Sequence, residues 1–326
     1  MLNSRRRFLK SSVVIGASLA GSVSATGFGQ SSPSQEQTPK GILEPPLLLP
    51  PSIPASQLQI PKVKFGDVEI SRLIIGCNPF YGFSHLNDTL STIMKEWYTP
   101  DKVCDVLHQC NRFGINTFNY LHAGRGPADL QRFREEGGQL HVIAQGFDNP
   151  EAIVKDVHPL AIYHNGEFSD RALRAGKMDT IREYCKKLRQ LGVMVGVGAH
   201  NPEVIARVEE AGWDVDFYAG CVYQRTRTPE EFRKLLNGEL PVGEVYLEDD
   251  PPRMYKVLRQ TKKPCFAFKV LAAGRINRPD DLNKAFRLAF ESIKPTDCIF
   301  VGMFPRTKNE VRENVEYVHK ILKGNS

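Results

Sequence analysis

The sequence predicts an α/β protein, a (β/α)8 TIM barrel with an N-terminal β-hairpin. Eight short apolar runs, rich in β-forming residues and bounded by Gly, Pro or Asn, recur between residues 72 and 303. Longer amphipathic stretches separate them, so that strands and helices alternate. The alternative is an open doubly wound sheet, which normally carries a G-x-G-x-x-G turn, but "GRGPAD" and "GVGAHN" both lack the third glycine. The runs are "RLIIGC", "INTFNYL", "HVIAQGF", "LAIYHN", "VMVGVGA", "VDFYAGCVY", "CFAFKVL" and "CIFVGM".

Residues 1–25 resemble a twin-arginine (Tat) signal peptide. "SRRRFLK" at positions 4–10 precedes an uncharged, mildly apolar stretch, and "VSA" at 23–25 is a small-residue cleavage site. A short membrane anchor is the alternative, although the stretch is too short and too polar to span a bilayer well. We therefore expect the Tat translocon to export the folded chain to the periplasm or another extracytoplasmic location, with no membrane attachment after cleavage. Such export is useful when a cofactor must be loaded first.

Residues 26–61 form a proline-rich linker before the barrel, which we assign to 62–326. Eight prolines lie between Ser31 and Pro61, and "EPPLLLPPSIP" has neither a helical nor a strand period. This composition is typical of an extended, partly polyproline spacer. The apolar residues 47–49 could instead strap onto the folded domain.

The charge of the chain gives no support to a nucleic-acid partner. The formal net charge is +6, and residues 1–25 contribute four positive charges and no acid, which leaves +2 for the rest. The seven cysteines are an odd number without a C-x-x-C pair, so they cannot all form disulfides. Four of them lie in apolar runs, where buried, reduced cysteines are expected.

Several connecting elements follow from local patterns. "KVKFGDVEIS" (62–71) holds two alternating segments hinged at Gly66-Asp67, a hairpin that would close the bottom of the barrel. Helices are expected at 179–192, at 201–212 with Asn201 as its cap, and from near Thr307 to Gly324.

Polar residues gather after the apolar runs, where a barrel carries its chemistry. Four of the eight histidines lie there, and His164, directly after "LAIY", is the best placed. Lys269 lies inside "CFAFKVLAAG". It either faces the barrel mouth, where desolvation would make it a base or an amine nucleophile, or snorkels on the outer face. The four histidines are His85, His122, His164 and His200.

"FVGMFPRTKNEVRENV" (300–315) predicts an anion site. A strand ends at Gly302, the next loop carries Arg306 and Lys308, and a helix follows. The loop after the seventh strand, "AAGR", adds Gly274 and Arg275. Barrels often bind phosphate between these two loops. The alternative is ordinary helix capping with exposed basic residues.

Four segments between residues 62 and 320 occur in the order of the predicted strands: "FGDVEISRLIIG", "VGAHN", "GCVYQ" and "VGMFPRTKNEVRENV". They are similar to the opening hairpin, the fifth and sixth strand ends and the nucleotide-binding segment of the aldo/keto reductase family, so residues 62–320 resemble that family. The resemblance implies bound NADP(H), with Asn201 at the fifth strand end and Tyr223 stacked on nicotinamide. It also implies that Arg306 or Lys308 holds the 2′-phosphate, and that Glu310 and Asn314 reach the adenine.

The catalytic residues depart from that family's Asp, Tyr, Lys and His. Asn119 stands in the aspartate's place, the tyrosine's position falls near Gly124, and Gln145 replaces the lysine. His164 matches the histidine, and His122 or Lys269 would replace the tyrosine as proton donor.

Three functions follow from these patterns. The first is an exported, NADP(H)-dependent oxidoreductase that acts on a carbonyl or alcohol of a small molecule such as a sugar. The second is a metal-dependent lyase, isomerase or hydrolase whose Zn²⁺ or Mn²⁺ is held by the four histidines, aided by Asp148 or Glu167. The third is a non-catalytic barrel that binds a ligand.

Overall fold

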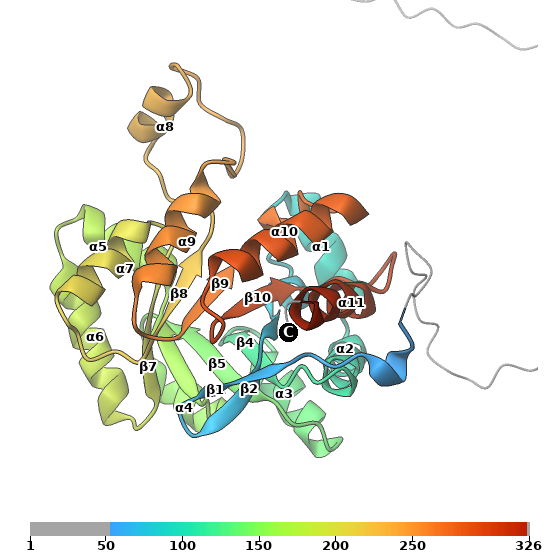
Figure 1. The fold of residues 1–326 in the computed structure, drawn as a ribbon. Helices are drawn as coiled ribbons and strands as arrows, with labels where there is room; N and C mark the ends of the chain where they lie inside the picture. The colour runs from blue at the N-terminus through green and yellow to red at the C-terminus, as the bar shows by residue number, and fades with distance from the viewer. Residues whose placement is uncertain (1–52, 325–326) are drawn as a thin grey trace, which may run out of the picture. The chain divides into compact units, whose positions relative to one another are not determined.

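A computed structural model describes residues 53–324, and in them eight parallel strands close into a barrel with helices outside it (Figure 1). The strands pair in the order β10-β3-β4-β5-β6-β7-β8-β9, which confirms the predicted (β/α)8 fold. The signal predicted at 1–25 lies outside the described residues, as does the linker up to residue 52. The barrel strands are β3 (Leu73–Gly76), β4 (Thr117–Leu121), β5 (His141–Gly146), β6 (Ala161–His164), β7 (Met194–Ala199), β8 (Phe217–Cys221), β9 (Cys265–Phe268) and β10 (Cys298–Gly302).

Several helices begin at side-chain caps that the sequence carries. Asn201 accepts a hydrogen bond from Glu203 N at 3.0 Å, as predicted for its helix. The last helix begins at Glu310 rather than near Thr307, because the Asn309 side chain caps it by accepting from Arg312 N. The helices are α1 (Asp88–Trp97), α2 (Pro100–Arg112), α3 (Gly126–Glu135), α4 (Pro150–Val157), α5 (Gly166–Arg174), α6 (Met178–Gln190), α7 (Pro202–Glu210), α8 (Pro229–Leu235), α9 (Asp250–Gln260), α10 (Pro279–Ser292) and α11 (Glu310–Lys323), with 3-10 turns η1 (Ala55–Gln57), η2 (Asn78–Tyr81) and η3 (Ala272–Gly274).

The predicted hairpin closes the bottom of the barrel. Strands β1 (Lys62–Phe65) and β2 (Val68–Ser71) pair in antiparallel fashion around Gly66-Asp67. The ring of Phe65 packs edge-on against Phe217 and Phe266, at centroid distances of 5.4 and 5.2 Å. Because Phe217 is the first residue of β8 and Phe266 the second of β9, the hairpin lies at the N-terminal end of the barrel strands, opposite the end where barrel enzymes carry their active sites.

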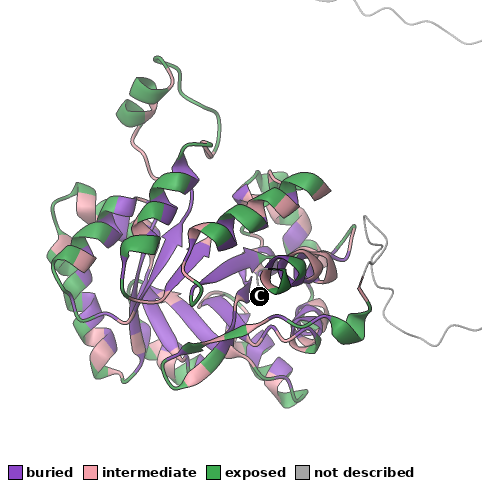
Figure 2. Ribbon diagram, in the orientation of Figure 1, coloured by how far each residue is buried: buried purple, intermediate pink, exposed green. Residues whose placement is uncertain are grey.

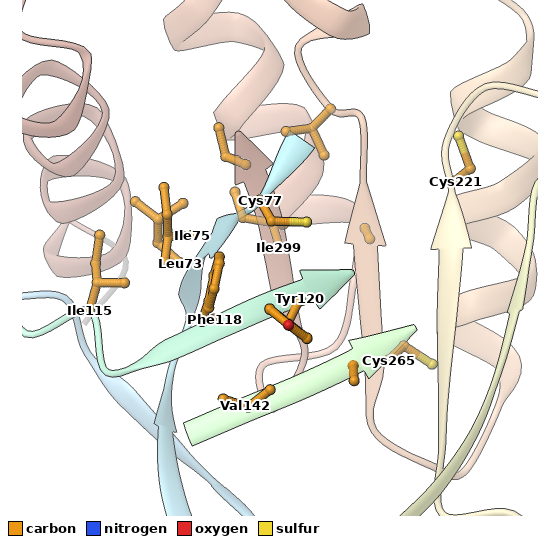
Figure 3. Packing of buried hydrophobic residues seen from close by; sticks show 14 of the residues in the cluster. Leu73, Ile75, Cys77, Ile115, Phe118, Tyr120, Val142, Cys221, Cys265 and Ile299 are labelled. Atoms are coloured by element: carbon orange, nitrogen blue, oxygen red, sulfur yellow. The ribbon is translucent and has the colours of Figure 1, made fainter. Parts of the chain in front are cut away.

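Alternation along the strands produces two cores. One set of side chains, including Ile74, Ile143 and Phe300, packs inside the barrel with the hairpin and contains no helical residue. The other set, including Ile75 and Phe118, packs between the strands and the helices (Figure 3). Figure 2 shows the consequence, with buried strands at the centre and helices exposed on their outer faces.

Two glycines of β7 make room inside the barrel for large rings. A Cβ atom on Gly196 would lie 2.4 Å from the Phe217 ring, and one on Gly198 would lie 2.8 Å from the Tyr163 ring. Neither contact is sterically possible without movement. Because β7 carries no side chain at these two positions, the rings of Phe217 and Tyr163 have room inside the barrel.

The described part of the proline-rich segment, residues 53–61, packs on the barrel. Leu58 and Ile60 are buried in the outer core, and Ile60 N donates to Phe113 O at 2.9 Å. The Gln59 backbone carbonyl lies 2.9 Å from His319 Nδ1. These residues serve as a strap on the barrel, so the spacer interpretation does not describe them.

All seven cysteines are buried and free, as predicted for those in the apolar runs. Within residues 53–324, no helix combines the length and the apolar character needed to cross a bilayer.

The longest connection at the C-terminal end of the strands contains residues 225–249, here called the arm. It carries α8 and projects from the barrel body (Figure 1). Its base is closed by a buried ion pair between Arg227, whose side chain is 5% exposed, and Asp250, the first residue of α9, whose side chain is 2% exposed.

Candidate functional site

A cavity of about 520 Å³ lies at the C-terminal mouth of the barrel. Its floor is aromatic, with Tyr163, Phe268 and Phe300 in contact at centroid distances of 6.4 Å for each neighbouring pair. Asn119 lines it and accepts from the Tyr163 hydroxyl at 3.1 Å. This is the size and place expected of a barrel enzyme's ligand site.

Lys269 lines the cavity, which decides between the two orientations that the sequence left open. Strand alternation turns Phe268 inward and would turn residue 269 outward, but Lys269 has a φ of 61°, and the alternation ends there. Burial, reinforced by the positive charge of Arg225, lowers the pKa of Lys269 to about 8. Among the described residues, its ammonium group has no hydrogen-bond or ion-pair partner.

His200 lines the cavity and is oriented by Asp170 of α5. Its Nδ1 lies 3.0 Å from Asp170 Oδ2, and the same carboxylate accepts from the backbone N–H groups of His200 and Asn201 and from Thr226 Oγ1. Because a carboxylate only accepts, Nδ1 carries a proton. Burial lowers the pKa of His200. Its Nε2 therefore presents a lone pair, 3.3 Å from Arg225 Nη1.

Glu244 connects the arm to the loop that carries His85. It accepts from Arg225 Nε at 2.9 Å and from the Tyr246 hydroxyl at 2.9 Å, and it lies 2.8 Å from His85 Nδ1. Burial favours the neutral acid, but the hydrogen bond from His85 and the charge of Arg225 outweigh it and hold the pKa of Glu244 well below its usual range. Arg275 lies 4.1 Å above the Tyr246 ring and donates to the carbonyls of His85 and Glu244.

The opposite wall of the cavity comes from the start of α11. Lys308 lines it and pairs with Glu313 at 3.2 Å, with both side chains nearly buried. Glu310 accepts from Phe304 N at 2.6 Å, and burial raises the pKa of its carboxyl to about 7. Asn314 and Gly274 complete this wall.

Two of the predicted catalytic histidines do not reach the cavity. Since Tyr163 points inward, His164 points out, where its Nδ1 lies 2.7 Å from Ser169 Oγ and its ring contacts Tyr184. Burial lowers the pKa of His164 to about 4. His122 follows the inward-facing Leu121 and lies 2.9 Å from Asp156 Oδ2 on α4. Their predicted place at the mouth is wrong, because strand alternation sends both side chains outward.

Four of the predicted cofactor residues also lie outside the cavity lining. Asn201 caps α7, Tyr223 packs against Tyr246 at 5.0 Å, and Arg275 is engaged by the arm. Arg306 is exposed on the loop after β10. Of the predicted set, the cavity brings together Asn119, Lys269, Gly274, Lys308, Glu310 and Asn314, with His85 and His200 from the metal hypothesis.

The predicted four-histidine metal site does not form. His85 and His200 line the cavity, whereas the other two face away from it. In the part of the chain that the structure describes, no three His, Cys, Asp or Glu side chains are placed to hold a metal ion. Both cavity histidines also use one ring nitrogen on a carboxylate.

Sequence reasoning missed Arg225, Glu244 and Asp170. Arg225 follows "GCVYQ" directly, so the strand-end rule could have found it. Glu244 and Asp170 come from a long connection and from inside a helix, and no local pattern marks them. Glu244 meets His85 across 159 positions of sequence.

The fold and the cavity define this chain as a (β/α)8 barrel with a ligand-sized cavity at the C-terminal end of its strands. No known protein-family profile matches the chain, and no curated protein matches its sequence. Several solved barrels are similar. A truncated 3-deoxy-D-arabino-heptulosonate 7-phosphate synthase from Thermotoga maritima has 12% identity and a TM-score of 0.45, covering 82% of this chain and 91% of that one.

Two further similar structures are an NADPH complex and a dehydrogenase chimera by description. A Gox0644 mutant in complex with NADPH has 10% identity and a TM-score of 0.46, over 80% of this chain and 93% of that one. A mutant of an active (S)-mandelate dehydrogenase chimera has 13% identity and a TM-score of 0.49, over 86% and 81%. Likeness at this level assigns no activity to this chain, and the fold rests on the closed barrel itself.

Proposed function

We propose that the cavity is the active site of an NADP(H)-dependent oxidoreductase that acts on the carbonyl or alcohol of a small polar molecule such as a sugar. One observation carries the proposal. A single cavity joins the residues expected at the nucleotide, Gly274, Lys308 and Asn314, to the residues expected at the reaction, Asn119 and Lys269. The order of motifs along the chain, which resembles that of the aldo/keto reductases, supports the same proposal.

The residues present fit a phosphorylated nucleotide. Lys308 is a nearly buried cation beside the N-terminus of α11, where backbone N–H groups and the helix dipole favour an anion. Gly274 has open space where a side chain would be, so its backbone is accessible to a ligand. Since Lys308 already pairs with Glu313, a phosphate would share or replace that partner.

NADPH, when bound, supplies a hydride to the carbonyl carbon. The ammonium of Lys269 then supplies the proton to the carbonyl oxygen, because a pKa of about 8 leaves it protonated yet weakly acidic at neutral pH. Asn119, held by the Tyr163 hydroxyl, keeps its amide N–H groups for the substrate. The aromatic floor excludes water beneath the reacting atoms.

Lys308→Ala should weaken NADPH binding about 10- to 100-fold, since a lost hydrogen bond to a charged group is worth about 1.5–3 kcal/mol. Arg306→Ala is the matched control, because Arg306 lies on the same loop outside the cavity, and it should bind as the wild type does. Isothermal titration and the NADPH-dependent shift in melting temperature measure both. Equal weakening by the two variants, or no binding by the wild type, would overturn the proposal.

No specific observation favours either alternative function. The four histidines of the metal hypothesis do not come together at the cavity. A barrel that binds NADPH but oxidises or reduces no carbonyl or alcohol would be the non-catalytic case, so turnover in a substrate panel separates it from the proposed enzyme.

We also propose that residues 1–25 direct export through the Tat translocon, with the nucleotide loaded before transport. Replacing Arg5 and Arg6 with Lys should keep the full-length chain in the cytoplasm, because the paired arginines carry the signal. Fractionation of cells that express wild type and variant, with immunoblotting, measures this. A periplasmic variant would contradict a Tat route.

A further inference from the structure

We propose that Lys269 forms a covalent imine with small hydroxylated aldehydes and ketones in the mouth cavity, without any nucleotide. The inference concerns the same cavity as the proposed function, but it needs neither NADP(H) nor the α11 wall. Through this imine, the cavity would bind carbonyl compounds covalently even when no nucleotide is present.

The amine of Lys269 is unpartnered where its neighbours are engaged. Arg225 pairs with Glu244, Lys308 pairs with Glu313, and Arg275 donates to backbone carbonyls. Over residues 53–324, Lys269 has no such bond, although it borders the cavity. A cation without a partner in a desolvated site favours its neutral form, and the neutral amine is the nucleophile.

The backbone that positions the Lys269 amine is conformationally strained. Lys269, Ala272 and Ala273 all have positive φ, at 61°, 48° and 52°, which is uncommon for residues with a Cβ atom. Ala272 N donates to Lys269 O at 2.7 Å and closes this turn. Such strain persists where the surrounding fold imposes it, and it gathers at functional sites. Here it directs the lysine into the cavity where a regular strand would direct it away.

Two histidines of the same cavity can move protons to and from the amine. His200 and His85 line the cavity with Lys269, and burial, together with the charge of Lys269, lowers the pKa values of both histidines. Each histidine has Nδ1 on a carboxylate. His85 keeps Nε2 for proton exchange, whereas His200 Nε2 lies 3.3 Å from Arg225 Nη1.

The chemistry balances with these groups alone. The neutral amine attacks the carbonyl carbon, a C–N bond forms, and the proton lost by nitrogen passes through a histidine to the oxygen. The C–O bond of this carbinolamine then breaks, and the oxygen leaves as water with a second proton, also from nitrogen. One amine and one carbonyl become one imine and one water, with no oxidant or reductant.

The remaining walls select a hydroxylated carbonyl compound. Gln145 and Asn165 border the cavity and are joined by a 2.8 Å bond from Asn165 Nδ2 to Gln145 Oε1, which leaves the Gln145 amide nitrogen for the ligand. With Asn119 they offer donors to hydroxyl groups, while the rings of Phe268 and Phe300 suit the C–H face of a short carbon chain.

Borohydride trapping tests the proposal. Purified protein incubated with glyceraldehyde and sodium borohydride, with no nucleotide, should gain a single stable adduct by intact-mass spectrometry, mapped to Lys269. Lys308→Met is the matched control, because it removes the other cavity lysine and should still be labelled. Lys269→Arg keeps the charge and should lose the adduct, as should Lys269→Met. The labelling rate should rise with pH up to about 8 and level off above, as the amine loses its proton.

An adduct spread over surface lysines, or an adduct that survives in both Lys269 variants, overturns the imine. Peptide mapping of the wild type decides the question even where a variant fails to fold. NADPH titration of the same preparation keeps the two proposals separate, because intact nucleotide binding without an adduct overturns only this inference.

Discussion

Lys269→Met should lower the kcat of carbonyl reduction about 10²- to 10⁴-fold, the usual range for a lost general acid. The proton donor to the carbonyl oxygen is then missing, because Arg225 is paired with Glu244 and the ring proton of His200 is held by Asp170. NADPH affinity should change little, because Lys308 and Asn314 stay in place. Steady-state kinetics with separate NADPH titration measures both effects.

The pH profile identifies the group behind this effect. Below pH 8 Lys269 carries its proton and can donate it, and as pH rises through about 8 the proton is lost, so the wild-type kcat should fall. The pKa of Lys269 lies below its usual range, so the fall comes earlier than for an ordinary lysine. Imine formation should change with pH in the opposite direction, because it needs the neutral amine.

His122→Ala is the control for Lys269→Met. The sequence placed His122 among the proton donors, but its ring contacts Asp156 outside the cavity. Its kcat should match that of the wild type. If His122→Ala lost most of its kcat while Lys269→Met stayed near the wild-type kcat, His122 would be the general acid and the role of Lys269 would be refuted.

Asp250→Ala should lower the free energy of unfolding by about 3–5 kcal/mol, because it leaves the cation of Arg227 buried without its partner. The carboxylate also accepts from Gln224 N at 3.1 Å and from Arg253, so several donors lose their acceptor together. Chemical denaturation monitored by circular dichroism measures the loss, with the slope checked for a two-state transition.

Arg233→Ala is the matched control on the same arm. Arg233 pairs with Glu230 one turn away, but both side chains are exposed, and such pairs contribute about 0–0.5 kcal/mol. An equal, small effect of the two substitutions would mean that the ion pair at the base of the arm does not stabilise the fold. Comparing the free energies of unfolding of Asp250→Ala and Arg233→Ala separates the loss of the buried ion pair from the loss of an exposed one.

Local patterns were sufficient for the architecture. Each strand is a short apolar run between turn residues, and the helices carry Asn, Thr and Pro at their starts, so composition and period locate them. The hairpin at 62–71 followed from alternation around Gly66-Asp67 in the same way. Since polar side chains after parallel strands share one end of a barrel, the general place of the site followed as well.

The sequence at the strand ends did not show which side chains point into the cavity. One residue of register separates a side chain in the cavity from one behind the sheet, and this sent His164 and His122 outward while Asn119 and Gln145 stayed inside. Lys269 broke the alternation through a left-handed φ that no sequence pattern signals.

The sequence by itself determined the class of fold, the order of its elements, the end of the barrel that holds the site and several of its residues, because these depend on periodicity and on local capping. Only the tertiary structure decided which of those residues meet. Arg225 and Glu244 of the arm meet His85 from a distant loop, and Asp170 orients His200 from a neighbouring helix. Hydrogen bonds across such separations form only after the barrel closes, so the chemistry of the cavity belongs to the closed fold.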